Sequence, residues 1–279
     1  MTIFPCAKVN LGLNVVSRRP DGYHNIETVF YPIPLFDALE VHRMDEDFPC
    51  ESDCDLKLSG IAIAGKEEDN LVVRAYQMLA RDFELPRVHV HLLKRIPAMA
   101  GLGGGSSDAA YMIRLLDERF HLNMGNSVME EYAARLGADC AFFITSEPAF
   151  AEGIGNELEP VCADDFSLEG KYMTLVRPDV AVSTREAYGN IKPRKPQKSC
   201  RLIVQQPIET WRDELTNDFE ETIFPLHPEI ETVKNRLYDM GAVYAQMSGS
   251  GSCVFGIFDT LPVIAPQDFP ECYVHTLTL

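Results

Sequence analysis

The stretch from Pro97 to Ala110, PAMAGLGGGSSDAA, holds four glycines and two serines between an apolar, β-rich run and a helical run. A loop that ends at the start of a helix presents unpaired N–H groups and the positive end of the helix dipole. Glycines let this backbone approach a phosphate, and serine hydroxyls add donors. The stretch therefore predicts a phosphate site. The alternative, a flexible linker, is seldom framed so closely by a strand and a helix.

The spacing of the glycines does not match the two best-known phosphate loops. The Walker A pattern needs a lysine directly after the glycines, and none follows here. The dinucleotide pattern is met by Gly101 and Gly103, but Ser106 stands where its third glycine belongs, and the loop lies in the middle of the chain. The loop alone predicts a phosphate binder and leaves its class open.

Two charged residues stand in contexts that could serve catalysis. Asp139, in LGAD, follows the helix-ending Gly137 and precedes the apolar run AFFIT, which we interpret as a strand that could project the carboxylate into a cleft. Lys8 lies inside an apolar strand, where a lysine needs a polar partner. The alternatives are a surface acid at a helix end and an exposed lysine on an edge strand.

The spacing of His and Cys residues gives little indication of a metal site. His89 and His91 share one face of a predicted strand, but without a third ligand they are better interpreted as residues of a solvated face. Cys50 and Cys54 lie four apart, and no second pair has zinc spacing. We predict no protein metal cluster, and we expect the basic loop 192–201 to be a solvated loop rather than an anion site.

Periodicity and turn signals give the elements that must position these residues. Alternation predicts strands, and helical spacing with an Asp/Asn start predicts a helix at 69–83 ending before Pro86. Further helices are expected from about Ser107, over 128–140, and around Leu215 and Ile230. The predicted strands cover 6–16, 26–33, 37–44, 87–96, 141–145, 149–161, 171–178 and the flanks of 247–252. An acidic segment at 157–170 predicts a domain boundary, giving domains 1–157 and 158–279.

Composition and charge exclude several classes of protein. The chain has 279 residues, of which 46% are hydrophobic, so it can bury a real core. A formal net charge of -17 argues against nucleic acid or a membrane surface as the partner. The longest uncharged run, 240–258, is too polar and too broken to span a bilayer. Eight scattered cysteines and the absence of a signal-peptide pattern predict reduced thiols and a cytoplasmic protein.

Three distant stretches together resemble a known family. AKVNLGLNV near the start, PAMAGLGGGSSDAA in the middle and MSGSGSCVFG near the end resemble the three motifs of the GHMP kinases. The longer stretch AKVNLGLNVVSRRPDGYHNIETVF, followed by EDNLVVRA, LGADCAFF and AFAEGIG, resembles the branch of that superfamily that serves the non-mevalonate isoprenoid pathway. The resemblance is weakest in the basic loop and after Asp259, where three prolines predict a shortened or irregular element.

The resemblance implies an α+β fold of two domains. The N-terminal domain would be mixed α/β, the C-terminal domain ferredoxin-like, and the active site would lie between them. ATP, with Mg²⁺, would phosphorylate a hydroxyl of a small-molecule substrate, 4-diphosphocytidyl-2-C-methyl-D-erythritol (a cytidine diphosphate methylerythritol). The protein would be a monomer or a homodimer. The alternatives left open are another GHMP kinase, of the homoserine or mevalonate type, and a nucleotide-binding regulator, although a regulator should have lost Lys8 or Asp139.

The resemblance also implies roles for individual residues. Asp139 matches the catalytic base, and Lys8 matches the lysine that pairs with it. The expected nucleotide-binding residues are Asn70, Leu71, Pro97, Gly101, Leu102, Gly103, Gly104, Gly105, Ser106 and Ser107. The expected substrate-binding residues are Asn10, Tyr23, His24, Thr184 and Tyr188. Tyr23 and Tyr188 would stack on the cytosine, and the segment Ser248 to Ser252 would line the cleft opposite the phosphates.

Overall fold

The computed structural model describes residues 1–63, 65–162, 166–189 and 191–279. The chain divides into two compact units, each assembled from separate segments. Unit 1 comprises Met1–Ala7, Leu35–Ala98 and Gly103–Ser146, and unit 2 comprises Lys8–Pro34, Met99–Leu102 and Glu147–Leu279. Part of the segment expected to hold a domain boundary, 163–165, lies outside the described residues.

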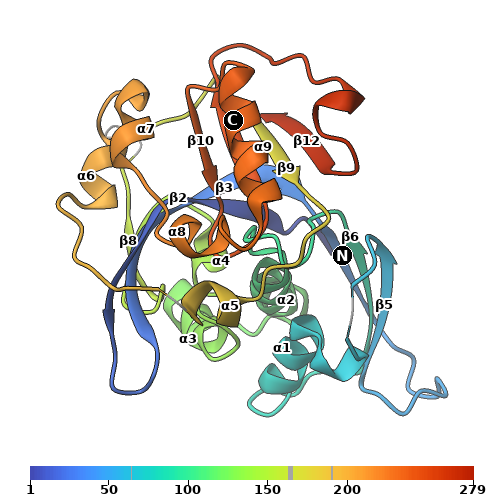
Figure 1. Ribbon diagram of the computed structural model, residues 1–279. Helices are drawn as coiled ribbons and strands as arrows, with labels where there is room; N and C mark the ends of the chain where they lie inside the picture. Colours follow the sequence, from blue (N-terminus) through green and yellow to red (C-terminus); the bar gives the residue numbers. More distant parts are fainter. Residues whose placement is uncertain (64, 163–165, 190) are drawn as a thin grey trace. The chain divides into compact units, whose positions relative to one another are not determined.

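Unit 1 is built on a four-stranded sheet of order β1-β4-β6-β5, of which β5 and β6 are labelled in Figure 1. Its strands are β1 (Thr2–Ile3), β4 (Ala38–Arg43), β5 (Cys54–Gly60) and β6 (Val88–Lys94). The β5–β6 pair is parallel, which requires a crossover. The crossover contains the short 3₁₀ turn η1 (Glu67–Asp69) and helix α1 (Leu71–Leu79).

The helices of unit 1 include the end of the glycine loop, at the start of α2 (Gly104–Phe120), and flank the turn that holds Asp139. They are α1, α2, α3 (Asn126–Ala134) and α4 (Phe142–Thr145). The predicted start of α1 is confirmed, because the side chain of Asn70 accepts the N–H of Val72 at 2.9 Å. The strand predicted over 141–145 is wrong. That run forms α4, with Phe142 and Phe143 buried, since a short apolar run fits a buried helix as well as a strand.

Unit 2 contains two four-stranded sheets. One has the order β2-β3-β7-β8, with β2 (Cys6–Arg18) and β3 (His24–Phe36) as long strands that begin or end in unit 1, followed by β7 (Ala149–Glu152) and β8 (Glu157–Pro160). The other is antiparallel, with the order β10-β11-β9-β12. Its strands are β9 (Tyr172–Arg177), β10 (Tyr244–Met247), β11 (Val254–Phe258) and β12 (Tyr273–Thr278).

The remaining helices of unit 2 lie between the strands along the chain, and α9 (Pro228–Asp239) packs on β10 and β11. They are α5 (Thr184–Gly189), α6 (Cys200–Val204), η2 (Ile208–Thr210), α7 (Trp211–Glu214), α8 (Glu220–Ile223), α9 and η3 (Pro266–Asp268). Ile230, Val233 and Leu237 recur at helical spacing on α9 and are buried in the core cluster. The helix predicted around Leu215 ends one residue earlier, as α7. The short η3 confirms the irregular element expected after Asp259.

Other predictions are settled by burial and by contacts. On β6 the valines at 88 and 90 are buried, while His89 is half-buried and His91 exposed, so the interpretation of the two histidines as residues of a solvated face is confirmed. All eight cysteines are free. Among the residues the structure describes, no helix is both long enough and apolar enough to cross a membrane.

Candidate active site

Unit 2 brings the three sequence motifs into one hydrogen-bonded cluster. The N–H of Lys8 donates to the carbonyl of Leu102 at 3.0 Å, which joins the first motif to the glycine loop. The hydroxyl of Ser248 donates to the carbonyl of Gly101 at 2.9 Å and accepts the N–H of Asn10 at 3.3 Å. Lys8, Asn10, Gly101, Leu102 and Ser248 are therefore held together by backbone and hydroxyl bonds within unit 2.

Two glycines of this cluster are required by close backbone approach. Gly101 has a φ of +76°, and a Cβ there would lie 1.8 Å from the carbonyl oxygen of Ser248. A Cβ on Gly251 would lie 2.1 Å from the amide nitrogen of Gly101. The contact between the second and third motifs thus depends on both residues lacking a side chain.

Lys8 is buried, with 3% of its surface exposed, so the alternative of an exposed lysine is wrong. Its Nζ donates to Asn10 Oδ1 at 2.6 Å and lies 4.8 Å from the centre of the Phe30 ring. The Asn10 amide in turn donates to the Thr28 hydroxyl at 3.1 Å. This chain of contacts holds an ammonium group in a buried, polar setting beside the glycine loop.

Asn217 is a positioning residue that sequence analysis missed. Its buried amide donates to the carbonyls of Met247 and Gly249, both at 2.8 Å, and so shapes the third motif. Its Oδ1 accepts the N–H of Phe219 at 3.0 Å. An asparagine in the break between two predicted helices was a usable signal, because Asn side chains commonly bond local backbone at such breaks.

Unit 1 holds the start of α2. The helix begins at Gly104, three residues before the expected Ser107, and Gly103 precedes it with a φ of 71°. The hydroxyl of Ser107, in the first turn, is fully buried and has no hydrogen-bond partner. An orphaned hydroxyl at a helix start, beside glycine backbone, fits a triphosphate bound there.

Unit 1 also holds the other nucleotide and catalytic candidates, and Leu71 lies beside this helix start. Leu71, directly after the Asn70 cap, lies 4.0 Å from where a Cβ of Gly105 would stand. Burial raises the pKa of the Cys140 thiol to about 11. The half-buried Asp139 adjoins Cys140 in the turn before α4. Pro97 is buried in the loop that leaves β6.

A buried charged cluster lies under the first turn of α2. Lys94 bonds Asp108 at 2.6 Å and also contacts Asp37, and all three side chains are buried. Asp37 also accepts the backbone N–H groups of Arg95 and Ile96. Burial raises the pKa of Asp108 to about 8. The attraction of Lys94 opposes this rise, whereas the charge of Asp37 adds to it.

The candidates for base binding lie in unit 2. Tyr23 stands beside the turn between β2 and β3 with 63% of its surface exposed. The His24 ring stacks on the Tyr188 ring, with centroids 4.8 Å apart and planes at 20°. The Phe219 ring packs against Tyr188 in a T-shaped arrangement, with centroids 4.8 Å apart. Thr184, at the start of α5, lies 3.5 Å from the hydroxyl of Ser250, which connects this group to the third motif.

Family models and sequence relatives both point to one enzyme family. The model "GHMP kinases N terminal domain" matches residues 70–147, and "GHMP kinases C terminal" matches residues 201–265. A 4-diphosphocytidyl-2-C-methyl-D-erythritol kinase of Bacteroides fragilis is 52% identical over 273 residues, which cover 98% of this chain and 97% of the relative. One from Parabacteroides distasonis is 48% identical and covers 98% of both chains.

The chain belongs to the 4-diphosphocytidyl-2-C-methyl-D-erythritol kinases. A solved structure of a 4-(cytidine 5'-diphospho)-2C-methyl-D-erythritol kinase agrees with the fold of this family member. It has a TM-score of 0.76 and 30% identity, and covers 100% of this chain and 99% of the other. A mevalonate kinase from Methanococcus jannaschii, at 12% identity and a TM-score of 0.67 (100% and 98% covered), shows the shared GHMP fold alone. The expected α+β GHMP kinase fold is thereby confirmed.

Proposed function

We propose that this kinase transfers the γ-phosphate of ATP to a hydroxyl of 4-diphosphocytidyl-2-C-methyl-D-erythritol, in the non-mevalonate isoprenoid pathway. The observation that carries the proposal is the 52% identity, over 98% of the chain, with a relative that has this name. The clustering of the three motifs supports it, because phosphoryl transfer depends on groups held in fixed positions.

The triphosphate is assigned to the glycine loop. Gly103, Gly104 and Gly105 offer backbone N–H groups at the start of α2, and Ser106 and Ser107 offer hydroxyls. Asn70, Leu71, Pro97, Gly101 and Leu102 complete the proposed nucleotide residues. When bound, Mg²⁺ would neutralise charge on the transferring phosphates. Since the described residues hold no cluster of three or more His, Cys, Asp or Glu that could bind a metal, we propose that the ion is held mainly by the phosphates, with a hydroxyl such as that of Ser107.

Asp139 is proposed as the base that accepts the proton of the substrate hydroxyl, and Lys8 as the cation that stabilises negative charge on its oxygen. Burial of Lys8 beside Asn10 supports this role, because an ammonium shielded from water acts more strongly on a nearby charge. Asp139 lies in the turn that leads into α4.

The cytidine is assigned to Tyr23, His24, Thr184 and Tyr188, with Asn10 closer to the reacting end. Aromatic faces hold a base by stacking, and a histidine can bond its edge. The stacked His24 and Tyr188 rings, together with the nearby Thr184–Ser250 contact, support a base site adjoining the third motif.

One assay tests the proposal. ADP release is followed with ATP and, separately, 4-diphosphocytidyl-2-C-methyl-D-erythritol, mevalonate and homoserine. We expect turnover with the cytidine compound alone, and loss of that turnover when EDTA removes Mg²⁺. Turnover with mevalonate or homoserine instead would make the chain a GHMP kinase of another specificity. Size-exclusion chromatography of the same sample tests the proposed monomer or homodimer.

A further inference from the structure

The six-residue helix α5 carries Tyr188, and its own length cannot hold it in place. Two contacts from other elements anchor it. The hydroxyl of Thr222 on α8 donates to the carbonyl of Ala187 at 3.1 Å, and Ala187 is fully buried. On the neighbouring residue, Glu186 Oε1 lies 3.0 Å from Nε2 of His227.

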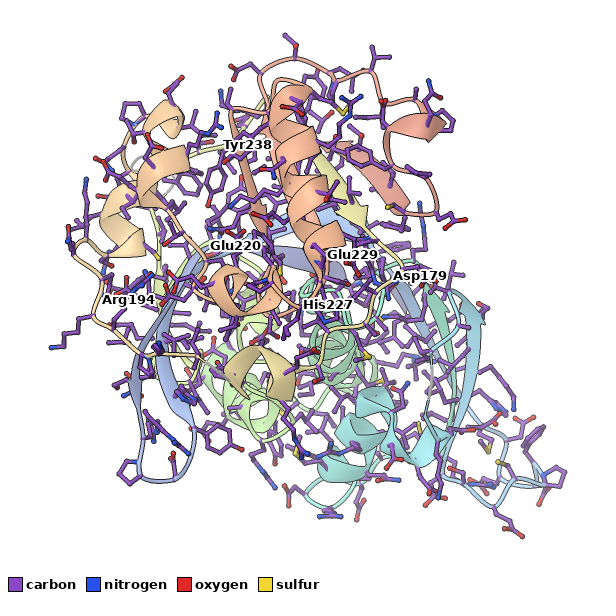
Figure 2. All side chains as sticks on the ribbon, in the orientation of Figure 1. Asp179, Arg194, Glu220, His227, Glu229 and Tyr238 are labelled. Atoms are coloured by element: carbon purple, nitrogen blue, oxygen red, sulfur yellow. The ribbon has the colours of Figure 1, made fainter. Side chains whose placement is uncertain are left out.

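His227 is fixed to the corner between α8 and α9. Its backbone N–H donates to the carbonyl of Ile223 at 2.8 Å, and Pro228 begins α9 directly after it. Figure 2 shows His227 at the lower end of α9, beside Glu229. Because a carboxylate can only accept, Nε2 must carry the proton that is donated to Glu186. The hydrogen bond with His227 lowers the pKa of Glu186.

We propose that His227 is a positioning residue for the cytidine end of the substrate, because it holds Glu186 and thereby fixes α5 with Tyr188. The inference rests on the proposed function. Tyr188 lies on the same short helix, two residues after Glu186. Its ring can keep its contacts with Phe219 and His24 only while α5 stays in place. Movement of α5 would displace the ring that is proposed to stack on the base.

The groups around His227 leave Glu186 as its hydrogen-bond partner. Glu186 Oε1 on α5 lies 3.0 Å from Nε2, whereas Glu229 Oε1 on α9 lies 3.8 Å from Nδ1, beyond hydrogen-bond distance. The acidic groups of α8 are engaged elsewhere, Glu220 with Lys234 and Glu221 with Arg194. Arg185, next to Glu186, is exposed. The side-chain anchor of α5 on this side is therefore the hydrogen bond between His227 and Glu186.

The test compares His227→Ala, His227→Gln and the control Glu229→Gln in the ADP-release assay. We expect His227→Ala to raise the KM for the cytidine substrate about two- to tenfold, the range for one net hydrogen bond. The kcat and the KM for ATP should stay at wild-type values. His227→Gln restores a donor and should keep a near-normal KM. Glu229→Gln should change KM by less than about twofold, since 3.8 Å is too long for a hydrogen bond.

The split between the KM for the cytidine substrate and the other kinetic constants separates positioning from a general structural role, and the near-normal KM of His227→Gln shows that the donated hydrogen bond is what matters. An unchanged KM in folded His227→Ala, or an equal loss in kcat and ATP affinity, would overturn the inference. If His227→Ala fails to fold, Glu186→Ala replaces it. A wild type without turnover on the cytidine substrate would instead refute the proposed function.

Discussion

The imidazole of His24 lies parallel to the phenol ring of Tyr188, with centroids 4.8 Å apart. Rings at this separation are already in stacking contact, so no base can enter between them in this arrangement. A cytosine that stacks on this face of Tyr188 must therefore displace His24, which would move the imidazole from the face of the base toward its edge. Burial, with a smaller contribution from Arg18, lowers the pKa of His24, so the stacked ring is neutral at pH 7 and can either donate or accept.

Truncation of the stacking rings should weaken substrate binding selectively. Tyr188→Ala should cost roughly 1–3 kcal/mol of binding for the cytidine substrate, the range for one base–aromatic stack, and Tyr23→Ala a similar amount. Calorimetric titration with the substrate and with a cytidine nucleotide measures both losses. ATP binding is the control and should be almost unchanged. The two losses need not add, since removal of one ring lets the base shift on the other. Unchanged binding in both folded variants would contradict the assignment of these rings to cytosine.

The glycine loop can be tested with two residues that both precede a helix. Gly103 precedes α2 with a φ of 71°, whereas Gly125 precedes α3 with a φ of -78°. Gly103→Val should raise the KM for ATP sharply, because a β-branched side chain opposes positive φ and blocks approach of the phosphates. Gly125→Val is the matched control, with no atom within 4 Å of its Cβ position, and should keep the KM for ATP. If folded Gly103→Val binds ATP with normal affinity, the loop does not hold the triphosphate.

A helix boundary was predictable from the sequence where a capping residue accompanied the periodic pattern. Asn70 marked the start of α1 because its side chain accepts the free N–H of Val72. The start of α2 was placed too late, at Ser107, since glycines are poor helix formers and the helix nevertheless begins at Gly104. The run 141–145 lacked any such signal. Its burial in unit 1 decides that it is a helix, and burial depends on tertiary contacts that periodicity does not contain.

The site was predictable as a list of motifs but not as a structure. Neither spacing nor composition shows that Gly101 and Gly251 meet backbone to backbone, because 150 positions separate them in the chain. The interleaving of the two units has the same origin, since Met99–Leu102 belongs to unit 2 while the residues on both sides belong to unit 1. The role of Asn217 follows from this contact, as its amide binds the loop that packs on Gly101.

Replacement of the proposed base should separate binding from turnover. Asp139→Asn keeps the shape of the side chain but cannot accept the proton of the substrate hydroxyl. We expect kcat to fall about 10²–10⁴-fold, the usual contribution of a general base, with little change in the affinity for either substrate. Stopped assays give kcat, and titration calorimetry gives the affinities. A folded Asp139→Asn protein with near-normal kcat would remove Asp139 from the mechanism.

The buried cluster of Lys94, Asp37 and Asp108 should make stability depend on pH. One lysine faces two carboxyl groups, and Asp37 has two further backbone donors, so Asp108 is the group that keeps a proton. Its pKa rises from 3.8 to about 8 on folding. Between these values the folded chain holds a proton that the unfolded chain has released, so this group makes folding less favourable as pH increases, and the effect levels off above about pH 8.

Asp108→Asn removes this titration while a neutral side chain of the same shape remains beside Lys94. The variant should gain stability over the wild type as pH rises, by more than about 1 kcal/mol between pH 5 and pH 8, because one pKa unit corresponds to about 1.4 kcal/mol. Urea unfolding at pH 5, 6.5 and 8 measures the difference in the free energy of unfolding. Asp117→Asn on the same helix is the control, since its carboxylate accepts the N–H of Met124 outside the cluster (2.8 Å) and should not follow this trend. A difference between Asp108→Asn and wild type that stays constant with pH would show that Asp108 is ionised in the folded chain.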